Sequence, residues 1–192
     1  MSHYFDIRLL PDDDYSEEVL RNTLYGKLHK TLKKLEMQTV GVSFPQYGLV
    51  EDGAQDRPEF GLVVRVHGSA EDLARLNGSG WLKGFTINAM VGAILPVPPA
   101  TGWVRVIRKQ VKTSVDRLRR RRMTRHGLSE EEVLLQLPEP AKLAPDLPFI
   151  MLYSGSTEQH YPIYIQQVAV DAPAEGAFNT FGLSKVATLP MW

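Results

Sequence analysis

The first hundred residues alternate between strand-like and helix-like patterns of hydrophobic and polar positions. Residues 3–9, HYFDIRL, alternate in polarity as a half-buried strand does. Asp14 and Glu17 are spaced as a helix capping box, and the helix predicted after them has one apolar stripe: Leu20, Leu24, Leu28, Leu32 and Leu35. The pattern then predicts strands at residues 40–44, 60–67 and 93–97, and a short helix at residues 69–76. With the polar residues 46–59 as a loop, the order β-α-β-β-α-β predicts a ferredoxin-like (RRM-like) unit.

The chain changes character near residue 100, where three prolines fall within residues 96–99. We therefore expect an α+β protein with a ferredoxin-like domain at 1–100 and a second α+β domain at 101–192. In the second half the pattern predicts an extended segment at residues 103–111 and helices at residues 114–126 and 129–137. It then predicts strands at residues 149–153, 160–168 and 178–181. Ser129 with Glu132 forms a capping box for the second of these helices.

Residues 105–126 hold ten of the chain's twenty-two basic residues and one acidic residue, although the whole chain is neutral. Packing like charges together costs self-repulsion, so such a cluster indicates a polyanionic partner. On a helix, the face opposite the apolar Val115, Leu118 and Met123 consists of Arg117, Arg120, Arg121, Thr124 and Arg125. Arginine presents a planar fork of donors that fits phosphate and stacks on bases. We interpret this arginine-rich helix as a nucleic-acid-binding element; the alternative is a solvated helix face.

The composition excludes several classes of protein. Without cysteine, the chain has no disulfide, no thiol-based zinc site and no catalytic cysteine. Its apolar runs are shorter than the roughly 18 residues of a membrane span, and its N-terminus lacks the pattern of a secretory signal. We therefore expect a cytoplasmic protein without membrane contact. The five histidines have no metal-binding spacing and no Gly-rich phosphate loop is present, so if the protein is an enzyme we expect a mechanism without metal or cofactor.

Two kinds of segment contain groups that could do chemistry. His29 lies one position from the leucine stripe, with Gly26 one turn before it, so it should emerge at the rim of the buried face, where little bulk blocks an approaching chain or ligand. A lone helical histidine is more often an ordinary surface or core group. The hydroxyl-rich residues 154–157 (SGST) follow a predicted strand and could bind phosphate, and residues 181–185 (FGLSK) share this character. Such segments are more often plain turns.

A series of motifs, in order along almost the whole chain, resembles one family, the pre-CRISPR-RNA processing endoribonucleases of type I-F systems. The motifs are HYFDIRL (3–9), GKLH (26–29), GVSFP (41–45), RLRRR (117–121), RHGLSEEE (125–132), DLPF (146–149), SGSTEQH (154–160) and FGLSK (181–185). The resemblance implies metal-free cleavage of the repeat transcript at the 3′ base of a hairpin, which leaves a 2′,3′-cyclic phosphate and a 5′-hydroxyl. It also implies a protein that is monomeric when free, keeps hold of the guide RNA hairpin, and joins the other subunits of a surveillance complex.

By position, the resemblance assigns catalytic roles to His29 and Ser154. His29 would be the general base that takes the proton of the attacking 2′-hydroxyl, and Ser154 would hold that hydroxyl in line with the phosphate. DNA at the cut site would then resist cleavage. The RNA-binding residues that the resemblance implies are Arg108, Gln110, Lys112, Arg117, Arg120, Arg121, Arg125, Ser156, Thr157, Tyr161 and Phe181. Arg108 and Gln110 would read the two bottom base pairs of the stem.

The sequence departs from the family pattern at three places. Phe181 stands where the family's best-known member has a tyrosine near the catalytic histidine, so it offers no side-chain hydrogen bond there. Thr124 stands where an arginine is often found, while Arg122 is gained. Residues 46–59 also diverge.

Two other interpretations stay open. One is a binding-only subunit in which cleavage is slow or lost, and Phe181 is compatible with it. The other is a general RNA-binding protein on a ferredoxin-like scaffold, which predicts broad, salt-sensitive affinity without a preference for hairpins.

Overall fold

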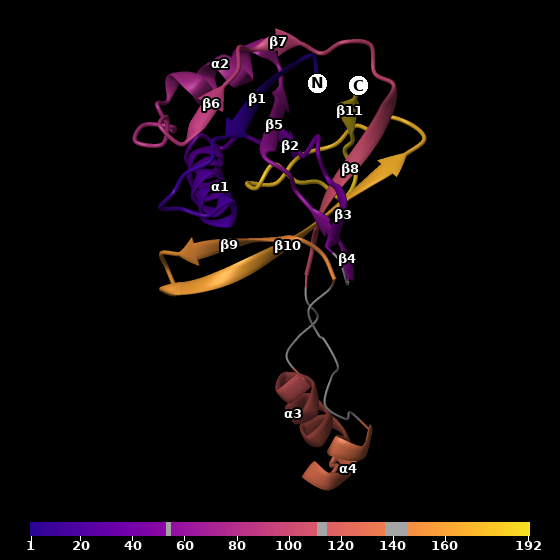
Figure 1. Cartoon of the computed structure of the whole chain (residues 1–192). Coiled ribbons are helices and arrows are strands. Elements are labelled where there is room, and N and C mark those ends of the chain that lie inside the picture. Colours follow the sequence, from indigo (N-terminus) through magenta and orange to yellow (C-terminus); the bar gives the residue numbers. More distant parts are fainter. Residues whose placement is uncertain (53–54, 111–114, 137–145) are drawn as a thin grey trace. The chain divides into compact units, whose positions relative to one another are not determined.

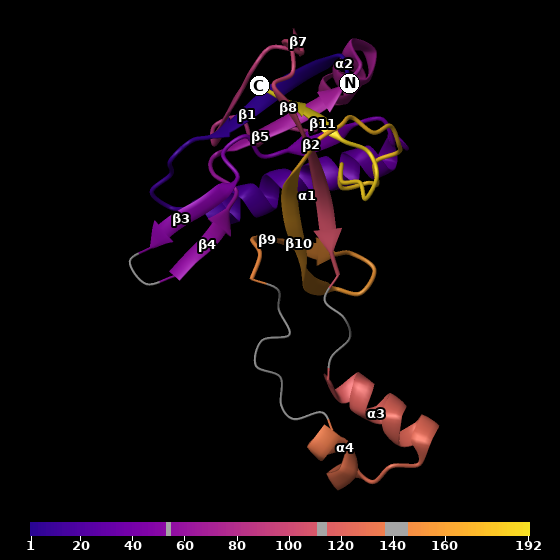
Figure 2. The same ribbon diagram turned by 90° about the vertical axis from the view of Figure 1, so that its right-hand side faces the viewer.

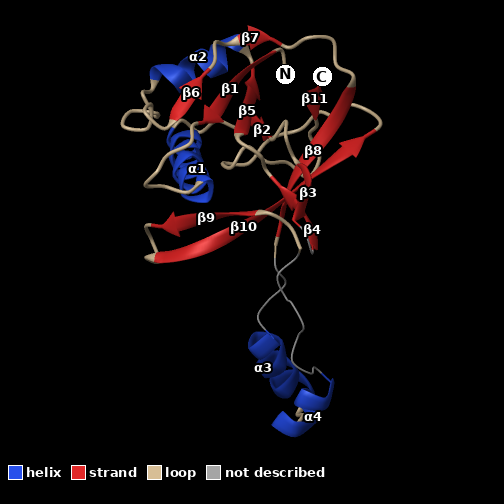
Figure 3. Cartoon of the chain, viewed as in Figure 1, coloured by secondary structure: helices blue, strands red, loops and turns tan. Residues whose placement is uncertain are grey.

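The computed structural model describes residues 1–52, 55–110, 115–136 and 146–192. Its helices and antiparallel strands give an α+β architecture, which confirms the predicted class (Figures 1 and 3). By their contacts the residues form two compact units. The large unit comprises Met1–Arg108 and Leu147–Trp192, and the small unit comprises Lys109–Asp146. These units are defined by contacts, whereas the predicted boundary near residue 100 separates parts expected to fold independently. That boundary stays a prediction.

The first sheet of the large unit has the strand order β2-β5-β1-β6, with β7 also paired to β1, and its pairings are antiparallel. Its strands are β1 (His3–Leu9), β2 (Gly41–Ser43), β5 (Val63–Gly68), β6 (Ala89–Val91) and β7 (Leu95–Pro96). Helix α1 (Glu17–Lys34) joins β1 to β2, and helix α2 (Ala70–Gly78) joins β5 to β6. The predicted β-α-β-β-α-β order is therefore present, with an added hairpin of β3 (Gly48–Asp52) and β4 (Gln55–Glu59).

The second sheet of the large unit has the strand order β11-β8-β10-β9 and leaves β9 at one edge (Figure 2). Its strands are β8 (Gly102–Lys109), β9 (Phe149–Ser154), β10 (Gln159–Val170) and β11 (Leu189–Met191). Strand β9 lies alongside α1. This contact brings residues near position 29 close to residues near position 154.

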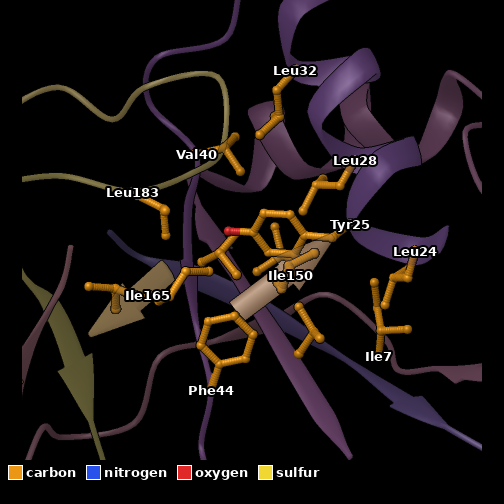
Figure 4. Packing of buried hydrophobic residues seen from close by; sticks show 14 of the residues in the cluster. Ile7, Leu24, Tyr25, Leu28, Leu32, Val40, Phe44, Ile150, Ile165 and Leu183 are labelled. Atoms are coloured by element: carbon orange, nitrogen blue, oxygen red, sulfur yellow. The ribbon is translucent and has the colours of Figure 1, made fainter. Parts of the chain in front are cut away.

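One hydrophobic core joins both sheets to α1 (Figure 4). Four leucines of the predicted stripe, Leu20, Leu24, Leu28 and Leu32, are buried, and the last three are fully covered. Leu35 is partly buried and caps the end of the helix. Alternate residues of β1 reach this core from the first sheet, and Ile150 and Ile165 reach it from the second. Since burial of such side chains stabilises a fold by roughly 1.5–3 kcal/mol each, this stripe fixes α1 on the sheets.

The start of α1 differs from the sequence prediction. Ser16, not Asp14, is the N-cap, and its side chain accepts a hydrogen bond from the backbone of Val19. The backbone N–H groups of Asp14 and Tyr15 are instead held by the side chain of Asp12. A turn centred on Asp12 therefore moves the helix start two residues along the chain.

Two further predictions of local structure were wrong. Residues 46–59 contain the β3–β4 hairpin rather than only a loop, and the sequence Asp-Gly at 52–53 is a hairpin signal that the loop prediction overlooked. Residues 178–181 form no strand, because the backbone there is held in a turn by the side chain of Asn179.

The small unit contains two short helices, α3 (Val115–His126) and α4 (Glu130–Gln136), which pack on each other. Helix α3 ends at Gly127, which has a φ of 62° and donates its N–H to the carbonyl of Met123. The capping box of α4 is confirmed, because Ser129 and Glu132 exchange side-chain-to-backbone hydrogen bonds of 2.8 and 3.2 Å.

Candidate active site

His29 lies near the C-terminal end of α1, directly after the buried Leu28. Its imidazole is half-buried, as its place beside the leucine stripe predicts. The helix that supports it is capped at Ser16 and has acidic residues in its first turn and basic residues in its last, which suits the helix dipole. His29 is therefore attached to a firmly anchored element while its ring stays accessible.

A turn near the C-terminus, residues 179–183, closes over the imidazole. The Nδ1 atom of His29 is 2.9 Å from the carbonyl oxygen of Thr180, and the ring of Phe181 stacks on the imidazole with centroids 4.0 Å apart and planes 13° from parallel. A carbonyl only accepts hydrogen bonds, so Nδ1 must carry the proton. In neutral His29 the Nε2 atom is then left unprotonated, and it can act as a base.

The same turn is fixed by four further hydrogen bonds. The Oδ1 atom of Asn179 accepts from the backbone N–H of Phe181 at 2.9 Å and of Leu183 at 3.2 Å. The hydroxyl of the buried Tyr25, one helical turn before His29, donates to the carbonyl of Phe181 at 2.7 Å. Gly182 adopts a φ of 70° and accepts from the backbone of β2. The orientation of the imidazole is thus determined by the turn as well as by the helix.

The surroundings of His29 favour its neutral form. Burial of the imidazole lowers the pKa of His29, and the hydrogen bond to the Thr180 carbonyl partly opposes this effect. Nearby cations lower the pKa of His29 further: Lys33, Arg108 and Lys30. At neutral pH the ring is therefore available to accept a proton rather than already holding one.

Strand β9 packs along α1. The backbone N–H of Met151 donates to Oδ1 of Asn22 at 2.9 Å, and Leu152 packs over Gly26. A Cβ atom at Gly26 would meet Leu152 at 3.7 Å, an ordinary contact, so close approach does not demand glycine there. Together α1, β9 and β10 enclose a groove of about 440 Å³ that has His29 in its wall.

Ser154 ends β9, next to the groove-lining Tyr153. Its Oγ atom lies 3.2 Å from Oγ of Ser156 and accepts from the backbone N–H of Thr157 at 3.3 Å. Ser154 is half-buried, whereas Ser156 and Thr157 are exposed. The hydroxyl-rich turn predicted at 154–157 is therefore present, with its hydroxyls close together.

The predicted RNA-binding residues of the large unit fall into two settings. The Arg108 guanidinium lies 5.1 Å from the centre of the Phe181 ring, so Arg108, Phe181 and His29 form one cluster. Tyr161 lies opposite Leu152 in the β9–β10 pair and packs against the core while half-buried, which supports a structural contribution of its ring.

The remaining predicted RNA-binding residues belong to the small unit. Arg120, Arg121 and Arg125 are exposed on α3, and Gln110 is also exposed. Arg122 donates to the Gln136 side chain of α4 at 3.1 Å. Lys112 lies outside the described residues, and Arg117 belongs to α3 but its side chain is not among those described.

Three residues that position the imidazole, directly or through the turn, were not predicted from the sequence. Tyr25 reads as a member of the apolar helix face, and Thr180 acts through its main chain. Asn179 precedes a Gly by three residues, as in many turns, and this was the one signal available. Neither Tyr25 nor Thr180 reveals from sequence that its partner, Phe181 and His29 respectively, lies 156 and 151 residues away.

Metal-binding clusters and membrane-spanning helices are both absent from the described residues. No group of three or more His, Cys, Asp or Glu side chains among them is arranged to hold a metal ion. Among the helices that the structure describes, none combines the length and the hydropathy of a membrane span.

Comparison with known proteins connects this site to a family. Residues 4–192 match the family described as CRISPR-associated protein (Cas_Csy4). The CRISPR-associated endonuclease Cas6/Csy4 of Pseudomonas aeruginosa (strain UCBPP-PA14) is 40% identical over 191 residues, and that of Escherichia coli (strain UTI89 / UPEC) is 37% identical over 191 residues. Each alignment covers 99% of this chain and 99% of the relative.

Among solved structures, one described as "An RAMP protein binding different RNA substrates" has a TM-score of 0.36 and 14% sequence identity, and the match covers 98% of this chain and 100% of that chain. A TM-score of this size does not establish a shared fold, so the assignment depends on sequence. The full-length sequence matches confirm the resemblance seen in the motifs: the chain belongs to the CRISPR-associated Cas6/Csy4 family of endonucleases.

Proposed function

We propose that this protein is a hairpin-specific endoribonuclease that cleaves CRISPR repeat transcripts at the 3′ base of the stem without a metal ion. The observation that carries this proposal is the fixed tautomer of His29, whose Nδ1 donates to the Thr180 carbonyl. That hydrogen bond leaves Nε2 as a base at neutral pH, on a chain whose relatives are named endonucleases.

In the proposed reaction, Nε2 of His29 takes the proton of the 2′-hydroxyl at the cut site. The 2′-oxygen attacks the adjacent phosphorus, and the bond from phosphorus to the 5′-oxygen of the next nucleotide breaks. That oxygen takes a proton from solvent, and His29 returns its own proton to solvent, so one proton is removed and one is delivered. The products are a 2′,3′-cyclic phosphate and a 5′-hydroxyl, so no external water or cofactor is consumed. Ser154 holds the 2′-hydroxyl in line with the phosphate, and such orientation can supply a large share of the rate.

The hairpin is bound by both units in this proposal. Arg108 and Gln110 read the bottom base pairs of the stem. The ring of Phe181 contacts both Arg108 and His29. The arginine-rich helix contributes Arg117, Arg120, Arg121 and Arg125, and Lys112 precedes it in the sequence. Ser156 and Thr157 contact the backbone near the cut, and Tyr161 lies beside the base of the stem.

After cleavage, the protein stays on the 3′ hairpin of the guide RNA and joins a type I-F surveillance complex as one subunit. We infer further that the sheet β2-β5-β1-β6 with α1 and α2 is a ferredoxin-like unit, since its strands occur in the order β-α-β-β-α-β and pair antiparallel. In such a unit the first helix packs on the sheet, which suits its role as the support of His29.

The competing candidate is a subunit that binds the hairpin without cutting it. It is favoured by Phe181, which lacks the hydroxyl of the tyrosine that the family's best-known member has at this position. However, the atom that holds Nδ1 of His29 here is a main-chain carbonyl, so the loss of a side-chain hydroxyl at position 181 does not free the imidazole. This argues for the enzyme.

The test is cleavage of the repeat hairpin from the protein's own locus in EDTA, beside an RNA with one 2′-deoxy nucleotide at the expected cut. We expect cutting of the first RNA and protection of the second. His29→Ala should bind the hairpin as wild type does but leave it intact. Tight binding of both RNAs with no cutting by wild type would instead establish the binding-only subunit.

The role of the arginine-rich helix is tested by Arg121→Ala. We expect weaker hairpin binding with an unchanged cleavage position, because a phosphate or base-edge contact is lost while the catalytic groups stay in the large unit. Equal affinity in a filter-binding titration would remove this helix from the interface.

A further inference from the structure

The groove between α1 and β9 is not used by the proposed mechanism except at His29. Its wall includes Lys27, Lys30 and His160, and none of its lining residues is acidic. Lys30 and His160 are exposed, and Lys27, whose ammonium donates to the Lys83 carbonyl at 3.0 Å, keeps two further donors. The groove is therefore basic, and His29 is one of the residues in its wall.

The floor of this groove is the open edge of a sheet. Strand β9 is the last strand of the order β11-β8-β10-β9, and its Met151 N–H points outward to Asn22. Met151 lies opposite Pro162, which has no N–H to offer, so this pair belongs to the set without ladder hydrogen bonds. Along a strand, the backbone groups of successive residues point to opposite sides, so residues 151 and 153 point to the same side. The N–H and C=O of Tyr153 therefore also point toward the open edge. A backbone N–H in this position can donate to a phosphate.

An exposed aromatic pair completes the groove. The Tyr153 side chain is 49% exposed, and its ring lies 5.3 Å from the ring of His160 on the neighbouring strand. Aromatic rings beside basic groups are the usual platform on which single-stranded nucleic acid stacks its bases. Tyr153 lines the groove together with Lys27 and Lys30, and it is exposed, so core packing does not account for its ring.

We propose that this groove binds the RNA segment on the 3′ side of the scissile phosphate, the strand that leaves after cleavage, with Lys27 and Lys30 on its phosphates and Tyr153 under its first base. This inference rests on the proposed function. His29 is the residue common to the groove and to the cluster of Thr180, Phe181 and Arg108, none of which lines the groove. If that cluster faces the base of the stem, a strand that crosses the active site leaves it through the groove.

Holding the leaving strand has a chemical purpose. In-line attack needs the 5′-oxygen of the next nucleotide opposite the attacking 2′-oxygen, and a fixed nucleotide on the 3′ side supplies that alignment. The same contacts are lost once the strand is cut, so the groove would favour the uncut transcript over the product.

The test compares two RNAs that cannot be cut. One is the hairpin ending at the cleavage site, and the other carries four more nucleotides on the 3′ side and a 2′-deoxy nucleotide at the cut. We expect wild type to bind the extended RNA about tenfold more tightly, as expected for one stacked base and a phosphate contact. Lys30→Ala and Tyr153→Ala should each reduce this ratio toward one without changing affinity for the short hairpin.

Matched variants distinguish the groove from general charge. Lys34→Ala removes an exposed lysine of the same helix that does not line the groove, and it should keep the wild-type ratio. Tyr153→Phe keeps the ring and should also keep the ratio. In a salt titration, Lys30→Ala should make the dependence of log Kd on log salt shallower by about 0.7 for the extended RNA only.

The outcomes separate the two proposals. A wild-type ratio near one, or a ratio unchanged in both Lys30→Ala and Tyr153→Ala, overturns the groove assignment while hairpin binding stands. Failure of wild type to bind either RNA overturns the proposed function, and the groove assignment falls with it.

Discussion

The turn that holds His29 depends on one exposed side chain, Asn179, and this dependence can be tested directly. Asn179→Ala removes the oxygen that accepts from the backbone of Phe181 and Leu183. Because Asn179 is exposed, the change leaves no buried cavity. Its main effect should be a looser turn, and the same turn carries the Thr180 carbonyl that fixes the imidazole.

The magnitude follows from the two lost hydrogen bonds. At about 1 kcal/mol each, the closed turn loses about 2 kcal/mol relative to open forms, roughly a thirtyfold change in that equilibrium. A base displaced by about 1 Å can cost on the order of a hundredfold in rate. We therefore expect single-turnover cleavage to fall about ten- to hundredfold. Hairpin affinity should change less than about threefold, because the arginine-rich helix is untouched and Phe181 is the one proposed RNA contact in the loosened turn.

Asn179→Asp is the matched control, since it keeps an acceptor oxygen at the same place. Its negative charge should raise the pKa of His29, so the two variants are compared at pH 8, where His29 is neutral in both. NMR of the His29 ring nitrogens gives a second readout, because the Asp variant should keep the proton on Nδ1 and the Ala variant should show a mixture of tautomers. Cleavage by Asn179→Ala at the wild-type rate, or equal loss in both variants, would refute the positioning role.

Three further predictions concern stability and pH. Gly182→Ala should cost about 3 kcal/mol in urea unfolding, because its φ is 70° and a Cβ would meet Val42 at 2.5 Å, whereas Gly80→Ala, with a φ of 69° and open space, should cost about 1 kcal/mol. Burial lowers the pKa of His67 to about 3, so below pH 6.5 the unfolded chain binds a proton that the native chain refuses, and stability rises with pH across this window. Wild type should therefore lose about 2 kcal/mol more than His67→Gln between pH 7 and pH 5 in urea titrations. Finally, kcat/KM for hairpin cleavage should rise with pH and level off below pH 6.5, since the pKa of His29 is lowered; an inflection above 7 would contradict the assigned environment.

The sequence predicted those parts of the site that depend on one helix. The spacing of the leucines identified the buried face of α1 and placed His29 at its rim, and the structure confirms both. The capping box of Ser129 and Glu132 was equally readable, because both partners lie within one turn. Local spacing determines such features, so local sequence suffices to predict them.

The local structure that was predicted wrongly depends on side chains that compete for backbone hydrogen bonds. Residues 178–181 read as a strand because Phe178 and Phe181 are apolar, yet the Asn179 side chain takes the backbone hydrogen bonds that a strand would need. Likewise, Ser16 and Asp14 are both good caps, and only the turn around Asp12 decides between them. In each case a side chain competes with the backbone pattern, and periodicity does not reveal which one prevails.

The arrangement around His29 also explains how the chain can accommodate phenylalanine at position 181. A tyrosine hydroxyl could hydrogen-bond a substrate or an imidazole, but here the imidazole is held by the Thr180 main chain and by the flat face of the Phe181 ring. The hydroxyl that stabilises the turn comes from the other direction, from Tyr25 on α1 to the Phe181 carbonyl. Ring stacking and main-chain hydrogen bonding need only an aromatic residue at 181. The polar requirement therefore falls on Tyr25 and Asn179, which belong to the scaffold of the site rather than to its substrate-facing surface.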